Sequence, residues 1–296
     1  MEIFRRAANP WNQEVLIGIS WDIMWAAAWV GLAFVVFHAL FVWGAGSKSE
    51  EAGGGNGNEA GVGERVERHG IAARVFHWIM ALSMLVLLIT AFFPVLGIQF
   101  AWVTIHWMAG VLLILSVAYH VVHATLVQDF WSMGIDGRDV GEVIKLIKGF
   151  LSRTDGHTKA GKYPADHKLY HHVIVVVTGF AIITGILMMV RVDTPFWTRN
   201  PYLLADSTWG VVYVLHGLSG VALITMVMAH IYFAIRPEKL WITRSMVYGW
   251  IRREDFLLHH DPGRWVVSGT ASTDVPPLTS GAGVAEAVPQ DSDPAP

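Results

Sequence analysis

The chain has 296 residues, of which 53% are apolar and only 15% are charged. Because soluble domains carry about 25% charged residues, this composition predicts an integral membrane protein. The absence of cysteine excludes iron–sulfur clusters, covalently attached haem, disulfides and thiolate catalysis. The net charge of −3, without a basic cluster, gives no indication of a nucleic-acid partner.

Five apolar stretches are long enough to form helices that cross about 30 Å of hydrocarbon, which takes about 20 residues. They cover residues 15–44, 75–95, 103–127, 170–192 and 209–235. The first is too long for the apolar region of a signal peptide, and no clear cleavage site follows it, so we expect a retained helix. The sequence thus predicts an all-α integral membrane protein, with a four-helix transmembrane bundle and one extra N-terminal transmembrane helix.

Composition divides the chain into five segments. They are an N-terminal segment with the extra helix (1–44), a Gly-rich linker (45–70), the four-helix core (71–235), a cytoplasmic amphipathic segment (236–267) and a disordered tail (268–296). Within the core, apolar residues recur at helical spacing over 140–151, which predicts a helix lying in the membrane interface.

The distribution of Lys and Arg predicts the orientation, because cytoplasmic loops are enriched in both. Residues 45–74, the loop 128–169 and the segment after residue 235 hold 17 of the 21 Lys and Arg residues. The opposite face holds the other four, Arg5, Arg6, Arg191 and Arg199. We therefore expect the N-terminus outside and the C-terminus inside.

The functional prediction depends on the histidines, because placing a histidine inside a membrane span costs free energy and such residues are usually functional. His216 and His230 lie 14 residues apart on the last predicted helix. At about 100° per residue both face the same side, and about 1.5 Å per residue separates them by about 21 Å along the axis. One is expected near the outer leaflet and the other near the inner leaflet, at the separation of two haems stacked across a membrane.

Each haem needs a second axial imidazole from a facing helix. His77 lies near the inner start of the helix predicted over 75–95, at the depth of His230. His106 lies near the outer start of the helix predicted over 103–127, at the depth of His216. We therefore predict two haems b, with the inner iron bound by His77 and His230 and the outer iron by His106 and His216.

The positions of two glycines agree with this prediction, and the two axial ligands expected for each iron indicate what the haems can do. Gly110 and Gly220 each follow an outer ligand by four residues, on its own helix face, where glycine lets a flat macrocycle approach the backbone. The alternative, hydrogen bonds between intramembrane histidines and neighbouring helices, suits one histidine but not four whose depths pair. Iron with two axial histidines has no open position for a substrate, so we predict electron transfer and no catalytic residues in this chain.

Other histidines allow more than one interpretation. His120, His123, His171 and His172 gather at the inner ends of two predicted helices. They could donate protons or hydrogen bonds to a quinone, or they could cap helix ends at the interface. We interpret His38, in the first helix, as a packed polar residue rather than a ligand.

Short segments around the predicted ligands match a known pattern. They are Arg74-Val75-Phe76-His77-Trp78, Ile105-His106-Trp107-Met108-Ala109-Gly110, Leu215-His216-Gly217 and His230-Ile231-Tyr232, with residues 243–250 and 259–262 beyond the last span. From about residue 64 to 267 the chain resembles the cytochrome b (gamma) subunits of respiratory formate dehydrogenases. The wider family includes the cytochrome b subunits of nickel–iron hydrogenases and thiosulfate reductase. The two segments after the last span favour the gamma-subunit type.

The resemblance implies the same four axial ligands and a place in the prokaryotic cytoplasmic (inner) membrane. It implies an iron–sulfur (or cytochrome c) partner outside, served by a molybdenum/tungsten or nickel–iron catalytic subunit. It also implies a quinone, menaquinone or ubiquinone, near His230, with candidate contacts from Asp166, Lys168, His171, His172 and His120. Pro164 lies in the segment where the family has an Asn-Ala-Gly-Gln run, and its side chain cannot make the hydrogen bond of an asparagine.

Three alternatives remain at the level of sequence. The chain could serve a nickel–iron hydrogenase or another molybdenum enzyme, because the N-terminal helix could dock a different partner. A histidine-rich membrane transporter would need charged residues deep in the spans, and these are almost absent. A structural anchor would tether a soluble enzyme without haem.

Overall fold

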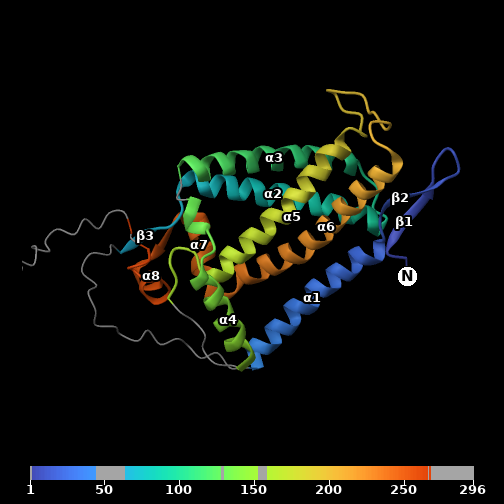
Figure 1. Ribbon diagram of the computed structural model, residues 1–296. Helices are drawn as coiled ribbons and strands as arrows, with labels where there is room; N and C mark the ends of the chain where they lie inside the picture. Colours follow the sequence, from blue (N-terminus) through green and yellow to red (C-terminus); the bar gives the residue numbers. More distant parts are fainter. Residues whose placement is uncertain (1, 45–63, 128–129, 153–158, 266, 268–296) are drawn as a thin grey trace, which may run out of the picture.

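The computed structural model describes residues 2–44, 64–127, 130–152, 159–265 and 267 (Figure 1). Five of its helices are long and apolar enough to cross a membrane: α1 (Trp21–Gly44), α2 (Ile71–Phe92, extended to Leu96 by a 3₁₀ turn), α3 (Trp102–Leu126), α5 (Ala165–Met189) and α6 (Asp206–Ile235). The five predicted spans and the helical membrane fold are thereby confirmed. α5 begins five residues before the predicted stretch, because its first turn is polar.

The N-terminal prediction is wrong over residues 15–19. These residues form a strand, β2 (Glu14–Ile19), which pairs antiparallel with β1 (Phe4–Ala8) in a hairpin. β-branched residues at alternate positions (Val15, Ile17, Ile19) favour a strand over a helix. Ser20 then starts α1 by accepting a hydrogen bond from the Asp22 backbone N–H at its Oγ, 3.2 Å away.

The hairpin and α1 pack closely along α6 (Figure 1). A Cβ at Gly210 would lie 2.7 Å from Leu16 Cβ, and one at Gly217 would lie 2.8 Å from Ile19 Cγ1. Glycine is thus what allows β2 to approach α6 at both positions. The Thr225 hydroxyl on α6 also donates to the Ala27 carbonyl of α1, at 3.3 Å. The N-terminal segment is therefore an integral layer of the bundle, not an appendage.

The four remaining spans form two helix pairs. α2 packs along α3 and α5 packs along α6, whereas contacts between the two pairs are sparse. Buried polar side chains inside these spans are hydroxyls, at Ser83, Thr90, Ser116, Thr184 and Ser219. Small hydroxyl residues are typical of helix interfaces in membranes, since they allow close approach and satisfy their own hydrogen bonds. Large apolar side chains are mostly exposed on the outer faces, where they would contact lipid.

A compact cap closes one end of the bundle. It comprises β3 (Arg65–Glu67), α7 (Leu240–Tyr248), β4 (Trp250–Arg252) and α8 (Arg253–His259), with β3 and β4 paired antiparallel. Val66, Ile251, Phe256 and Trp265 form its apolar core. Residues 64–70, expected in the linker, instead supply β3 and the entry to α2. Residues 236–265 of the segment expected as amphipathic fold into this cap. Residues 45–63 and 268–296 lie outside the described residues.

The described parts of the three segments rich in Lys and Arg lie at the cap end. The predicted interfacial helix 140–151 is α4 (Gly137–Ser152), which lies at this end with β3, α7 and α8, whereas the β1–β2 hairpin lies at the opposite end (Figure 1). The chain thus has a basic cap end and a hairpin end. This distribution is the one on which the predicted orientation depends.

Candidate functional site

Two histidine pairs bridge the two helix pairs. Near the hairpin end, the ring centroids of His106 on α3 and His216 on α6 are 6.2 Å apart, with 72° between the ring planes. Near the cap end, the centroids of His77 on α2 and His230 on α6 are 6.5 Å apart, with 55° between the planes. The structure thus brings together the four histidines in the two predicted combinations.

Each histidine of the hairpin-end pair is held by a threonine of the adjacent helix. Thr90 Oγ1 on α2 lies 2.8 Å from His106 Nδ1, and Thr184 Oγ1 on α5 lies 2.9 Å from His216 Nδ1. Both threonines are almost fully buried, at 2% and 4% exposure. These contacts fix the rotation of each imidazole and leave its Nε2 for another partner.

The cap-end pair has a different environment. The Tyr170 ring on α5 stacks on His230, with centroids 5.6 Å apart and planes 16° apart. The Tyr170 hydroxyl donates to the Met226 carbonyl at 3.1 Å, so it does not hold an imidazole nitrogen. His77 and His230 therefore depend on packing for their orientation.

Glycines leave room beside the hairpin-end pair. A Cβ at Gly220 would meet nothing within 4 Å, and one at Gly110 would meet only Leu87 Cδ2, at 4.0 Å. Gly185 on α5 lies against the other histidine, because its Cβ would be 3.4 Å from His216 Cε1. The backbone therefore leaves open space around the α-carbons of Gly110 and Gly220.

The sequence from residue 68 to 249, more than half of the chain, matches the family model of prokaryotic cytochrome b561. The chain belongs to this cytochrome b family. A curated relative is the formate dehydrogenase cytochrome b556 subunit of Haemophilus influenzae, which is 26% identical over 222 residues. The match covers 68% of this chain and 82% of the relative. The predicted resemblance is thus confirmed, and the hairpin and α1 precede the family segment.

Membership makes the protein a multi-pass membrane cytochrome b, an electron-transfer protein with haem b. The histidine pairs fit such a haem. Each pair places two imidazoles of facing helices with ring centroids 6.2 to 6.5 Å apart, so these residues could hold a haem, which would supply one-electron chemistry at iron. No metal cluster of three or more His, Cys, Asp or Glu competes with them in the described part of the chain.

The other histidines at the cap end divide into two groups. His120 on α3 and His171 on α5 face each other, with ring centroids 6.3 Å apart. Within the described ranges, Nδ1 of His120 and Nδ1 of His123 are buried without a hydrogen-bond partner. His172 is exposed, and its Nδ1 contacts the Lys168 carbonyl at 2.8 Å. Of these four histidines, His120 and His123 offer buried ring nitrogens that lack a hydrogen-bond partner among the described residues.

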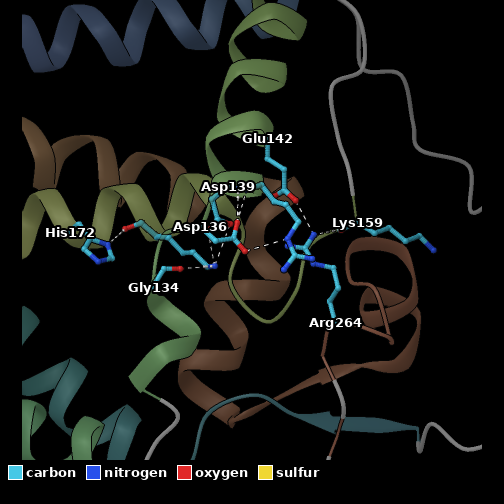
Figure 2. Close-up of polar contacts among 9 residues, drawn as sticks. Gly134, Asp136, Asp139, Glu142, Lys159, His172 and Arg264 are labelled. Carbon is cyan, nitrogen blue, oxygen red and sulfur yellow. Dashed lines mark hydrogen bonds and ion pairs between the residues drawn. The ribbon is translucent and has the colours of Figure 1, made fainter.

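Of the two charged quinone candidates, Lys168 lies against α4 and Asp166 is exposed to solvent. The Lys168 ammonium contacts both carboxylate oxygens of Asp139, at 3.2 and 3.0 Å, and the Gly134 carbonyl at 3.0 Å (Figure 2). These three acceptors use the three protons of the ammonium and dock α4 onto α5. Asp166 is exposed in the first turn of α5, directly after the N-cap residue Pro164 and Ala165. Neither side chain faces the histidine pairs through a described contact.

The cap holds a buried cation, Arg68, against His260. Arg68 donates to His260 Nε2 at 3.0 Å and to the Lys162 carbonyl at 3.3 Å, and it lies over the Trp241 ring. Burial lowers the pKa of Arg68 to about 10. Burial and then the Arg68 charge lower the pKa of His260 to about 4, so this histidine is neutral at pH 7.

His38 has the packing role that the sequence suggested. Its Nδ1 lies 2.9 Å from the Tyr232 hydroxyl and 3.2 Å from an Arg236 nitrogen. Arg236 also pairs with Glu238, at 2.6 Å, and this partner raises its pKa. The cluster attaches α1 to the cap end of α6.

Sequence reasoning missed Thr90, Thr184, Gly185 and Tyr170. The sequence carries no periodicity that marks them, because their role depends on how α2 and α5 are rotated against their neighbours. A mid-span threonine at the depth of a predicted ligand is the one signal that could have found the first two.

Proposed function

We propose that the chain is the dihaem membrane subunit of a respiratory oxidoreductase complex. It would pass electrons between an iron–sulfur (or cytochrome c) partner and the quinone pool. The name of the Haemophilus relative favours a formate dehydrogenase as the catalytic enzyme. A nickel–iron hydrogenase or another molybdenum enzyme is the second candidate.

The proposal rests mainly on one observation, that four histidines pair across facing helices at two places in the bundle. His77 with His230 and His106 with His216 would supply the four axial nitrogens of two haems. The two positions on α6 are 14 residues apart, which corresponds to about 21 Å along the helix. Bound haem would supply one-electron chemistry at iron, without an open coordination position for substrate. The protein would orient the imidazoles, exclude water and set the potentials.

The basic cap end favours an orientation with the cap in the cytoplasm and the hairpin outside. The prokaryotic cytoplasmic membrane is the corresponding location. In this orientation His106 and His216 face the outer partner, and His77 and His230 face the quinone side. An iron–sulfur partner would therefore dock beside the hairpin end.

For the quinone we propose a position beside the cap-end pair, where His120 and His171 face each other. The buried, unsatisfied Nδ1 of His120 is the atom that favours it, since a quinone oxygen could accept a hydrogen bond there. Asp166, Lys168 and His172 are the weaker candidates, because they are exposed or already bound.

The experiment is a set of single substitutions in the full chain, in its native membrane. We expect His216→Ala and His77→Ala each to lose about one of the two haems, measured from the reduced-minus-oxidised spectrum per chain. His172→Ala, on an exposed histidine outside both pairs, is the control and should keep both haems. Loss of both haems, or of neither, in the first two variants would contradict the assignment.

A transporter or a haem-free anchor would give no b-type band in any of these preparations. The quinone position has its own measurement. His120→Phe should lower quinone reduction while leaving both haems in place. Unchanged quinone reduction would exclude this position.

A further inference from the structure

We infer that Thr90 and Thr184 are matched positioning residues for the outer haem, which fix the tautomer of its two histidines and lower its reduction potential. The inference rests on the proposed dihaem function. It concerns two residues that the family resemblance does not identify as part of the site.

The first step is a count of hydroxyl protons. A threonine hydroxyl has one proton, and in the middle of a helix it donates to a carbonyl three or four residues earlier. Thr90 Oγ1 lies 2.7 Å from the Val86 carbonyl, and Thr184 Oγ1 lies 2.6 Å from the Phe180 carbonyl. Both protons are therefore used within the threonine's own helix.

The positions of the threonine protons determine which nitrogen of each imidazole carries its hydrogen. Because each threonine oxygen has only lone pairs left, His106 Nδ1 and His216 Nδ1 must each carry a hydrogen and donate it. The neutral imidazole then has its lone pair on Nε2, the atom that can bind iron. Two threonines on two different helices thus impose the same tautomer on both ligands.

The third step is the near absence of water. Thr90 is 2% exposed and Thr184 is 4% exposed, so solvent cannot replace either contact. Gly185, next to Thr184, lets α5 lie against the His216 ring. A buried acceptor that orients a metal-bound histidine also raises the basicity of that ligand.

The fourth step is the asymmetry between the two pairs. Among the residues that the structure describes, no protein group makes a hydrogen bond to a ring nitrogen of His77 or His230. A more basic ligand stabilises ferric iron over ferrous iron. The two threonines therefore lower the potential of the outer haem relative to the inner one, which favours electron movement from the outer side to the inner side.

The test uses Thr90→Val and Thr184→Val in the full chain, with Thr90→Ser and Thr184→Ser as conservative variants. Valine keeps the shape and removes the hydroxyl oxygen that accepts from the imidazole, whereas serine restores that oxygen. Thr125→Val is the matched control, since Thr125 donates to its own Val121 carbonyl at 2.9 Å but contacts no ligand histidine. The readouts are haem content, a potentiometric titration followed in the visible spectrum, and the low-spin ferric electron paramagnetic resonance signal.

We expect each valine variant to raise the potential of one haem and to change its ferric signal, while the other haem stays unchanged. Outer-ligand partners of this kind typically contribute 10–100-fold to metal affinity. A tenfold loss confined to the ferric form corresponds to a rise of about 59 mV for a one-electron couple. The serine variants should return to the wild-type potential, and Thr125→Val should not differ from it.

Three results would overturn the inference: unchanged potentials in both valine variants, the same shift in Thr125→Val, or a haem loss that serine does not reverse. A haem loss that serine does reverse supports the positioning role. Failure of the proposed function gives a different result, because the wild-type chain would then lack two haems.

Discussion

The ion pair between Lys168 and Asp139 should control the docking of α4, and Asp139→Asn is the change that tests it. The two side chains are 12% and 3% exposed, and their charged atoms are 3.0 Å apart. Removing one partner of a buried pair costs about 3–5 kcal/mol, because the other charge stays buried and unpaired. The Gly134 carbonyl still accepts from Lys168 in the variant, so we expect the lower end, about 3 kcal/mol.

That loss corresponds to an opening equilibrium about 100-fold more favourable for α4. Hydrogen exchange followed by mass spectrometry on the membrane-embedded protein would detect it over Gly137–Ser152. The control is Arg138→Gln, at an exposed pair with Asp136, which should leave the exchange of α4 unchanged. The double variant Asp139→Leu with Lys168→Met should recover much of the protection, because it leaves no buried charge. Equal exchange in wild type and Asp139→Asn would refute the reasoning.

Two further predictions concern the N-terminal layer and the cap. Gly210→Ala should displace the β1–β2 hairpin from α6, because the added Cβ would overlap Leu16. Proteolysis of the hairpin should then become faster. The control Gly141→Ala, with open space around it, should leave the rate of proteolysis unchanged. The cap should lose stability as the pH falls from about 6.5 to about 4, because His260 accepts a proton in the unfolded state before it can in the folded one, next to Arg68 and His259. The loss is at most about 3 kcal/mol, measured by pH-dependent hydrogen exchange of the cap, and a flat profile would contradict it.

The helices and the histidine pairing could be predicted because both follow from the regular geometry of a membrane helix. Long apolar runs predict spans, and a 14-residue spacing predicts two positions on one face of α6. The hairpin was missed because Val15 to Ile19 continue directly into the apolar residues of α1, so hydrophobicity alone gives no boundary. Its packing against Gly210 and Gly217 is a tertiary contact between residues about 200 positions apart.

The partners of the predicted site residues could not be read from sequence for the same reason. The sequence places Lys168 at the start of a span, where it could contact a quinone. The structure shows that its partner is Asp139 of α4. The contacts of Thr90 with His106 and of Thr184 with His216 depend on the rotation of α2 and α5 about their axes, which the sequence does not give. Sequence periodicity gives the depth of a residue, whereas its partner depends on how helices pack.

The most direct test of the account is the number and coordination of haems in the purified wild-type chain. A haem assay per chain, combined with the reduced spectrum before and after carbon monoxide, measures both. The account predicts two haems b per chain and no spectral change with carbon monoxide, because each iron already has two axial histidines. One haem or none per chain, or a haem that binds carbon monoxide, would contradict it.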